Sequence, residues 1–240
     1  MSFSTYKKRL VADIRGGDYS HPGSKEIITI IMDGVYPSRD NRILDVGSGL
    51  GGTTEVLTQY GQVVGVDNDT DVLKYAKEKY ASLNFIEADA HSLHTAFPEN
   101  SFNIVTLLSS FYSFKHPESV CQSLAKVCKP KSKLKLLDYT SQLPESKNPF
   151  HNNNLFKPIN KENIQNTLGK WKIESIRDVS KDFENEYQYI IDRLHKEEQR
   201  LVKKFGRSAY NKVLSSYLII HSTLVSGDLG GAIIFASLEK

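Results

Sequence analysis

The chain has 240 residues, of which 39% are hydrophobic and 25% charged, and its formal net charge at pH 7 is +3. These values are ordinary for a folded globular protein, and so small a charge gives no argument for binding to nucleic acid or to a membrane surface. No linker rich in Gly, Ser or Pro divides the sequence, so we expect one domain over residues 1–240.

The amino-terminal stretch MSFSTYKKRLVAD lacks the apolar core of a secretory signal. No run in the sequence approaches the ~20 apolar residues that a membrane span requires. We therefore expect a cytoplasmic protein that makes no membrane contact.

Short apolar runs alternate with helical patterns through the first part of the chain. The intervening segments TTEVLTQYG, TDVLKYAKEKYA and ESVCQSLAKVCKP carry apolar residues at helical spacing, with Thr70 as an N-cap and Gly61 and Pro130 as closing residues. Such an alternation predicts an α/β fold, a parallel sheet covered by helices on both faces. The apolar runs are bounded by turn residues, as buried parallel strands are, and lie at 43–46, 63–67, 84–88, 102–108 and 133–139.

The last third of the chain has a different pattern. A candidate strand, WKIESIRDVS at 171–180, is followed by a long stretch with mostly helical spacing, in which Gly206 separates two helices. The chain then ends in an apolar strand after a Gly-rich turn, GDLGGAIIFASLEK at 227–240. A helical insertion of this length is large enough to roof a cleft, which favours a buried small-molecule pocket over an open protein or nucleic-acid surface.

A glycine-rich loop leaves the first strand at ILDVGSGLGG, residues 43–52. Such a turn, entering a helix, presents unhindered backbone N–H groups to a ligand. Asp67, at the tip of the second strand and about 20 residues past Gly47, is placed to accept hydrogen bonds from ribose hydroxyls. Because Gly47, Gly49 and Gly52 also satisfy the dinucleotide pattern G-x-G-x-x-G, a nicotinamide enzyme and a methyltransferase both fit at this point.

Two carboxylates favour S-adenosylmethionine as the ligand. Asp45, two residues before Gly47, could reach the ammonium group of S-adenosylmethionine, whereas it would repel a pyrophosphate. Asp89 and the amide of Ala90 offer an acceptor and a donor side by side, as adenine requires. We assign cofactor binding to Asp45, Gly47, Gly49, Asp67, Asn68, Asp89, Ala90 and Leu107, and we expect no metal.

With these motifs the chain resembles the class I S-adenosylmethionine-dependent methyltransferases. The resemblance is carried by DVGSGLGG, GVDND, EADA and AKVCKPKSKLKLLDY, which together lie within residues 43–139, and by the closing strands. It implies a Rossmann-like, seven-stranded, mostly parallel sheet with an antiparallel last strand and a helical cap over the active site. It also implies S-adenosylmethionine as cofactor and S-adenosylhomocysteine as product.

Within that family the chain is similar to small-molecule N-methyltransferases of the phosphoethanolamine type, in LDVGSGLGG, FPENSFNIV, LLDYT and GGDYSHPGS. In such enzymes a tyrosine-bearing amino-terminal segment closes over the site, and a tyrosine after the fifth strand helps to bind the substrate phosphate. Tyr19 and Tyr139 stand in the corresponding places. The family usually carries an Asp and a His after the fourth strand, where this chain has SSFYSF at 109–114.

Methyl transfer requires alignment of the nucleophile, exclusion of water and removal of any proton it carries. We expect residues 1–24 to form a lid with hinges at Gly16, Gly17 and Gly23. Tyr19 and His21 would lie over the methyl group, with His21 as general base, and Tyr139 completes the catalytic set. We assign substrate binding to Phe111, Tyr112 and Phe114, whose ring faces suit a methylated cation.

The sequence thus predicts a methyltransferase that acts on a small molecule, an amine or a phosphobase-like metabolite. A cofactor-binding regulatory protein without transfer, or a methyltransferase for a macromolecule, remains the alternative. A nicotinamide oxidoreductase is disfavoured by Asp45 and by the closing strands, and the oligomeric state stays open. The expected divisions are a lid at 1–24, a cofactor-binding core at 25–139, a loop, helix and late strand at 140–180, a helical cap at 181–226 and a closing strand at 227–240.

Overall fold

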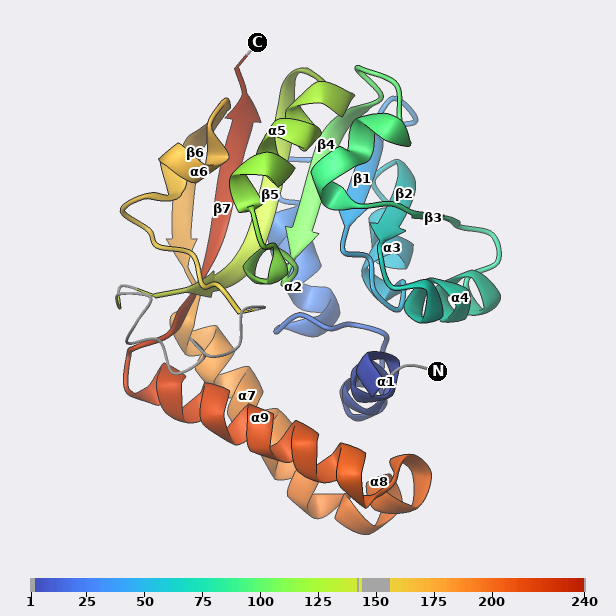
Figure 1. The fold of residues 1–240 in the computed structure, drawn as a ribbon, viewed down its shortest axis with the longest axis vertical. Helices are drawn as coiled ribbons and strands as arrows, with labels where there is room; N and C mark the ends of the chain where they lie inside the picture. Colours follow the sequence, from blue (N-terminus) through green and yellow to red (C-terminus); the bar gives the residue numbers. More distant parts are fainter. Residues whose placement is uncertain (1–2, 142, 144–155, 240) are drawn as a thin grey trace.

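The computed structural model describes residues 3–141, 143 and 156–239, and it contains a seven-stranded sheet in the order β3-β2-β1-β4-β5-β7-β6. Within these residues β7 alone runs antiparallel to its neighbours β5 and β6. Figure 1 shows β4 pointing toward the helices at one end of the molecule and β7 pointing away from them. The predicted fold class is therefore confirmed. The strands are β1 (Arg42–Val46), β2 (Gln62–Asp67), β3 (Asn84–Glu87), β4 (Phe102–Leu108), β5 (Cys128–Thr140), β6 (Trp171–Asp178) and β7 (Gly230–Leu238).

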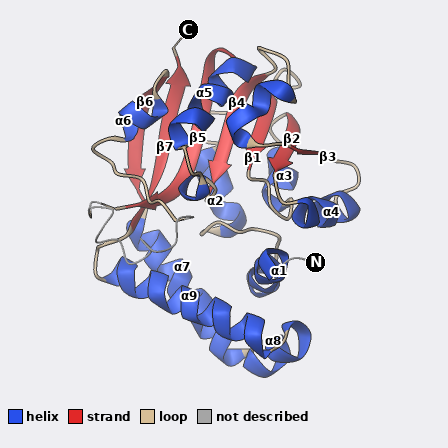
Figure 2. Cartoon of the chain, viewed as in Figure 1, coloured by secondary structure: helices blue, strands red, loops and turns tan. Residues whose placement is uncertain are grey.

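Helices cover both faces of the sheet and one of its ends (Figure 2). The α-helices are α1 (Phe3–Arg15), α2 (Ser24–Ile31), α3 (Gly52–Leu57), α4 (Thr70–Lys79), α5 (Pro117–Val127), α6 (Ile164–Leu168), α7 (Ser180–Lys196), α8 (Glu198–Phe205) and α9 (Arg207–Val225). Two 3-10 turns, η1 (Ala90–Thr95) and η2 (Phe111–Ser113), follow β3 and β4.

Three details of the predicted elements were wrong. The cap of α4 is Asp69 rather than Thr70, because the Asp69 carboxylate accepts the amides of Asp71 and Val72. Pro130 lies inside β5 rather than ending α5, which stops at Val127. The late helical segment breaks at Glu197 as well as at the predicted Gly206.

Alternation along the strands divides the core between two faces, since successive strand residues point to opposite sides of a sheet. On β1, Leu44 packs with α5, α6 and η1, whereas Ile43 packs with α2 and α3. On β5, Leu136 and Leu137 divide in the same way. Every central strand is thereby buried on both faces, as the continuous apolar runs indicated.

The amino-terminal helix α1 shares an apolar cluster with the late helices. Leu10, Val11 and Ile14 of α1 pack with Ile190 and Leu194 of α7 and with residues of α8 and α9. Figure 1 shows α1 between the end of the sheet and the helices α7 to α9. We call α7, α8 and α9 the helical cap. None of the helices described is both long enough and apolar enough to cross a membrane.

Candidate functional site

The glycine-rich loop lies at the switch point of the sheet. Because β2 and β4 flank β1 on opposite sides, the carboxyl end of β1 is the position at which ligands of open α/β sheets bind. The amides of Gly47 and Ser48 donate to the carbonyl of Val66 at 2.8 and 2.9 Å, which ties the loop to the end of β2. Gly47 has φ of 77°, and a Cβ at this residue would collide with Cβ of Ser110. Only glycine therefore fits at position 47.

Asp67, at the end of β2, holds this loop through its carboxylate. Oδ2 accepts the amide of Gly49 at 3.0 Å, and Oδ1 accepts the amide of Asp69 at 3.0 Å. Each carboxylate oxygen keeps a second lone pair that a ribose hydroxyl can use. The structure thus brings Asp67 and the glycine loop together, with exposed Asn68 next in the chain. Binding of ribose by these residues stays a prediction.

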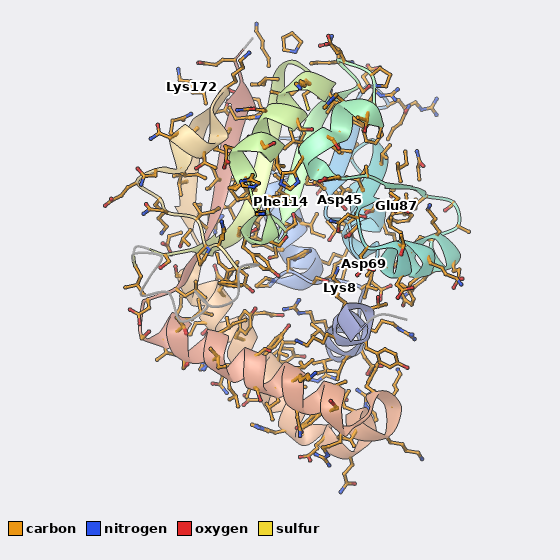
Figure 3. The ribbon with its side chains drawn as sticks, viewed as in Figure 1. Lys8, Asp45, Asp69, Glu87, Phe114 and Lys172 are labelled. Atoms are coloured by element: carbon orange, nitrogen blue, oxygen red, sulfur yellow. The ribbon has the colours of Figure 1, made fainter. Side chains whose placement is uncertain are left out.

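Asp45 is a buried carboxylate in the middle of the sheet. It is 2% exposed, and it accepts hydroxyl hydrogen bonds from Thr54 of α3 at 2.7 Å and from Thr106 of β4 at 3.0 Å. Figure 3 shows Asp45 on β1, with Asp69 beyond the end of β2 and Glu87 at the end of β3. Burial raises the pKa of Asp45 to about 6, against the hydrogen bonds from the two threonines, which lower it. Asp45 therefore connects three elements, and its contact with a ligand ammonium stays a prediction.

Exchange of Asp45 for asparagine is expected to flatten the dependence of stability on pH. A carboxyl whose pKa is raised by folding contributes stability that is fully present below about pH 4 and is lost as pH rises through about 6. In that window the contribution of Asp45 to the free energy of unfolding of wild type falls by up to about 1.4 kcal/mol per pH unit. Urea unfolding of wild type and of the variant at pH 4, 5 and 6 measures it. An Asp45→Asn protein with the wild-type slope would contradict this assignment.

Asp89 caps η1 and leaves room for a ligand. Its Oδ1 accepts both the amide of His91 at 2.9 Å and Nδ1 of His91 at 2.7 Å, and the side chain is 59% exposed. These hydrogen bonds lower the pKa of Asp89, so the carboxylate is ionised at neutral pH and its second oxygen can accept an amine proton. Ala90 begins η1 directly beside it. The pair has the arrangement predicted for adenine, and the contact itself stays a prediction.

Asp138 is a candidate site residue that the sequence reasoning did not identify. It is 0% exposed; its Oδ2 accepts the amides of Phe111 at 2.8 Å and Tyr112 at 3.2 Å, and its Oδ1 accepts the amide of Tyr139 at 2.7 Å. Burial raises the pKa of Asp138 to about 7, although these amides lower it. The carboxylate therefore shapes the loop after β4. A lone Asp within the apolar run of KLKLLDY was the signal available.

The backbone at the end of β4 is strained. Ser109 has φ of 54°, in the left-handed region that favours glycine, and its amide donates to the carbonyl of Leu137 at 2.7 Å. Its hydroxyl is buried with no hydrogen-bond partner within the described chain. Strain of this kind is retained where the surroundings fix the backbone, and it gathers at functional sites. Ser109 is thus a second site residue that the sequence did not reveal.

The three aromatic residues predicted to bind substrate do not lie together. Tyr112 contacts Tyr139 and Phe156, with ring centroids 5.3 and 4.9 Å apart. Phe111 instead belongs to the core on the other face of the sheet, 3% exposed, with Phe114 beside it at 6.1 Å. Leu107, predicted at the cofactor, is fully buried in that same core. The loop after β4 therefore sends its rings to opposite faces of the sheet, and the binding roles stay predictions.

Five aromatic rings form what we call the tyrosine cluster, beneath the helical cap. The hydroxyl of Tyr139 on β5 hydrogen-bonds that of Tyr187 on α7, and burial raises the pKa of both well above the ordinary value. Tyr187 in turn lies 4.8 Å from Tyr217 of α9, ring to ring. The cluster therefore connects the sheet with the cap. Its members are Tyr112, Tyr139, Phe156, Tyr187 and Tyr217.

The segment after α1 is anchored to the glycine loop. A Cβ at Gly52 would come within 2.7 Å of the carbonyl oxygen of Asp18, so the two backbones are in direct contact. The Asp18 carboxylate accepts the hydroxyl of Tyr80 at 2.9 Å and pairs with Lys79 at 2.6 Å. Tyr19 follows, half-buried beside His21, with rings 5.7 Å apart. The predicted lid residues thus lie against the candidate cofactor loop.

His21 is held by neighbours at both ring nitrogens. It is 1% exposed, with Nδ1 3.1 Å from the carbonyl of Pro22 and Nε2 3.1 Å from the hydroxyl of Thr53. Burial lowers the pKa of His21 to about 4, so the ring is neutral at pH 7. Since the carbonyl can only accept, Nδ1 donates and Nε2 accepts from Thr53. A general-base role stays a prediction that would require His21 to exchange the Thr53 bond for one with the acceptor.

Comparison with known proteins gives a match over the same part of the chain. Residues 44–136 match the family model described as a methyltransferase domain. The ubiquinone/menaquinone biosynthesis C-methyltransferase UbiE of Ectopseudomonas mendocina is 30% identical over 122 residues, which are 47% of this chain and 46% of that protein. The chain thus matches about half the length of this curated relative.

Solved structures share the fold over nearly the whole chain. Phosphoethanolamine N-methyltransferase 2 of Haemonchus contortus, in complex with phosphomonomethylethanolamine and S-adenosylhomocysteine, superposes with a TM-score of 0.83 at 21% identity, covering 100% of this chain and 61% of that one. The [4+2]-cyclase SpnF superposes with a TM-score of 0.80 at 16% identity, covering 98% and 93%. At these identities the likeness shows the fold alone.

Proposed function

Because this chain contains a methyltransferase domain and has the fold of the class I S-adenosylmethionine-dependent methyltransferases, we propose that it transfers a methyl group to a small-molecule acceptor. The observation that carries the proposal is the joining of Asp67 to the glycine loop at the switch point. That arrangement offers acceptors for ribose hydroxyls beside a backbone surface without side chains.

The donors and acceptors of the site fit S-adenosylmethionine. Asp67 would hold the ribose, Asp89 and the amide of Ala90 would hold the adenine, and the loop from Gly47 would lie along the amino-acid part. When bound, the cofactor supplies an electrophilic methyl on a sulfonium. The lid would then exclude water from that methyl, because Asp18 already joins it to the loop.

The tyrosine cluster supports an acceptor that is an amine or a phosphobase-like metabolite. Ring faces attract the cationic product of amine methylation, and Tyr139 and Tyr187 carry hydroxyls that can hydrogen-bond a polar acceptor. The cluster lies where the cap meets the sheet; Tyr139 and Tyr187 are buried there and Tyr217 is half-buried. A buried site of this kind favours a small acceptor over a macromolecule.

The second candidate is a cofactor-binding protein without transfer activity. It is favoured by one observation: His21, the residue proposed as base, is neutral and engaged at both ring nitrogens. The fold is also shared with a protein named as a cyclase. A methyltransferase acting on a macromolecule is a third reading.

Transfer of labelled methyl from S-adenosylmethionine into a cell lysate, separated afterwards into polar metabolites, protein and nucleic acid, tests the proposal, with phosphoethanolamine and simple amines assayed alongside. We expect label in one small molecule and none after Asp67→Ala. Label in protein or nucleic acid alone would replace the small acceptor with a macromolecule. No label anywhere, with S-adenosylhomocysteine bound normally in calorimetry, would establish the second candidate.

A further inference from the structure

We propose that Arg15 is a positioning residue, which sets the lid tyrosine Tyr19 over the site by linking it to Glu186 of the helical cap. The inference rests on the proposed function, since it assigns a residue to the same transfer reaction. It depends on three observations: the burial of Arg15, its two hydrogen bonds and its place among the tyrosines.

Arg15 is the last residue of α1, and its side chain is only 1% exposed. Arginine is rarely buried to this extent unless it is paired, because an isolated charge loses its hydration. Its Nε donates to Oε1 of Glu186 at 3.2 Å, and the Glu186 side chain is 18% exposed. The pair joins the end of α1 to the middle of α7.

The other end of the guanidinium fixes the lid. Nη1 of Arg15 donates to the carbonyl oxygen of Tyr19 at 3.3 Å. Between the two residues the chain reverses through Gly16, whose φ is 72°, and Gly17, whose carbonyl accepts the amide of Tyr19 at 2.8 Å. One planar side chain therefore holds both the cap carboxylate and the backbone of the lid from two separate nitrogen atoms, whereas a lysine carries all its donors on one nitrogen.

Arg15 also lies beside the tyrosine cluster. Its partner Glu186 is the residue before Tyr187, a member of that cluster, on α7. The guanidinium thus joins residue 19 of the lid to α7 of the cap. A displacement of Arg15 would change where Tyr19 sits relative to these rings, and misplacement of a group by about 1 Å can cost roughly a hundredfold in rate.

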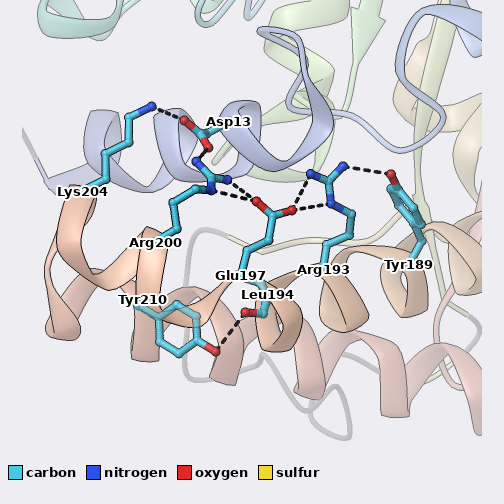
Figure 4. Close-up of polar contacts among 8 residues, drawn as sticks. All are labelled: Asp13, Tyr189, Arg193, Leu194, Glu197, Arg200, Lys204 and Tyr210. Carbon is cyan, nitrogen blue, oxygen red and sulfur yellow. Dashed lines mark hydrogen bonds and ion pairs between the residues drawn. The ribbon is translucent and has the colours of Figure 1, made fainter.

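A second set of ion pairs between α1 and the cap provides a matched control (Figure 4). Asp13 of α1 pairs with Arg200 and Lys204 of α8, whose side chains are 46% and 53% exposed. Glu197 continues this network by pairing with Arg193 and Arg200. The Asp13 side chain is 14% exposed, but its two partners are about half exposed, so removal of the Asp13 charge leaves no buried unpaired charge behind. Asp13 therefore also joins α1 to the cap, through α8 rather than α7, and its ion pairs do not involve residues 16–21.

The test compares Arg15→Lys, Arg15→Met, Glu186→Gln, the double variant Arg15→Met with Glu186→Gln, and the control Asp13→Asn. We expect Arg15→Met and Glu186→Gln each to have a lower melting temperature than wild type. The double variant should regain the wild-type melting temperature, because no unpaired charge stays buried. Its lid, at residues 16–21, should still exchange amide hydrogens at least about tenfold faster, and kcat should still be roughly tenfold lower, because the Tyr19 bond is missing. Arg15→Lys should keep the wild-type melting temperature but show the same faster exchange at residues 16–21 as the double variant. Asp13→Asn should match wild type in melting temperature and in exchange at residues 16–21.

The proposal would be overturned if the double variant had the wild-type exchange at residues 16–21 and the wild-type kcat as well as the wild-type melting temperature. Arg15 and Glu186 would then be an ion pair that only stabilises the fold. The amide hydrogen exchange of residues 16–21 can be measured without any methyl transfer. If wild-type protein transfers no methyl group, the proposed function fails. The role proposed for Arg15 is then still tested by the amide hydrogen exchange of residues 16–21.

Discussion

Replacing Asp138 with alanine is expected to lower the free energy of unfolding by roughly 4 kcal/mol, because it leaves three buried amides without an acceptor. Each orphaned donor costs about 1–3 kcal/mol. The amides belong to Phe111, Tyr112 and Tyr139, so the loss falls on the loop after β4 and on the end of β5. Urea unfolding at pH 7 measures the change.

The variant Asp138→Asn separates the effect of lost hydrogen bonds from the effect of a smaller side chain. Its carbonyl can still accept the amides of Phe111 and Tyr112, while its NH₂ group faces the amide of Tyr139, so we expect about half the loss seen with alanine. The wild-type pKa of about 7 adds a pH effect: stability from this carboxyl is present below about pH 4 and declines up to pH 7, and neither variant should show that part of the decline. Equal stability of the alanine variant and wild type would remove Asp138 from the site.

Asp67→Ala is expected to weaken binding of S-adenosylhomocysteine roughly a hundredfold or more. Hydrogen bonds to a charged group contribute about 1.5–3 kcal/mol each, and about 2.7 kcal/mol corresponds to a factor of a hundred in Kd. The variant loses the acceptor for ribose and also the bond that holds the Gly49 amide. Titration calorimetry with S-adenosylhomocysteine gives the affinity directly.

Asp69→Ala is the matched control for Asp67. Asp69 caps α4 through the amides of Asp71 and Val72, so its loss should cost about 1 kcal/mol of stability while affinity for the cofactor product stays near that of wild type. Unchanged affinity in Asp67→Ala would mean that the ribose binds elsewhere. Equal weakening in both variants would assign the effect to the fold of this loop rather than to a contact.

The sheet could be predicted because buried parallel strands are read directly from the sequence. Apolar runs between turn residues located β1 to β5, and the Gly-rich turn before the last run located β7. The predicted ends of helices were less accurate where two neighbouring residues could both cap the helix. Asp69 and Thr70 are both good caps, and the carboxylate accepts two amides, so the helix begins one residue beyond it.

The candidate site was predictable only where its residues lie in a local motif. Gly47, Gly49 and Asp67 follow from the strand-loop-helix pattern, and the structure joins them through hydrogen bonds. Arg15 reads as a surface charge in the sequence, since its partner Glu186 is 171 positions away. Phe111 and Tyr112 are neighbours in the chain, yet they pack on opposite faces of the sheet, which the sequence of a short 3-10 turn does not specify.

The apolar cluster shared by α1 and the helical cap has a consequence for synthesis on the ribosome. About 190 residues separate the end of α1 at Arg15 from the start of α9 at Arg207. At about 5–20 residues per second, α1 waits about 10–40 s for this partner. A helix of 13 residues is marginal by itself in water, so Leu10 and Ile14 are exposed to chaperones during that time. Although α1 precedes the other described helices in the chain, it therefore cannot bury its apolar face completely until the cap has been translated.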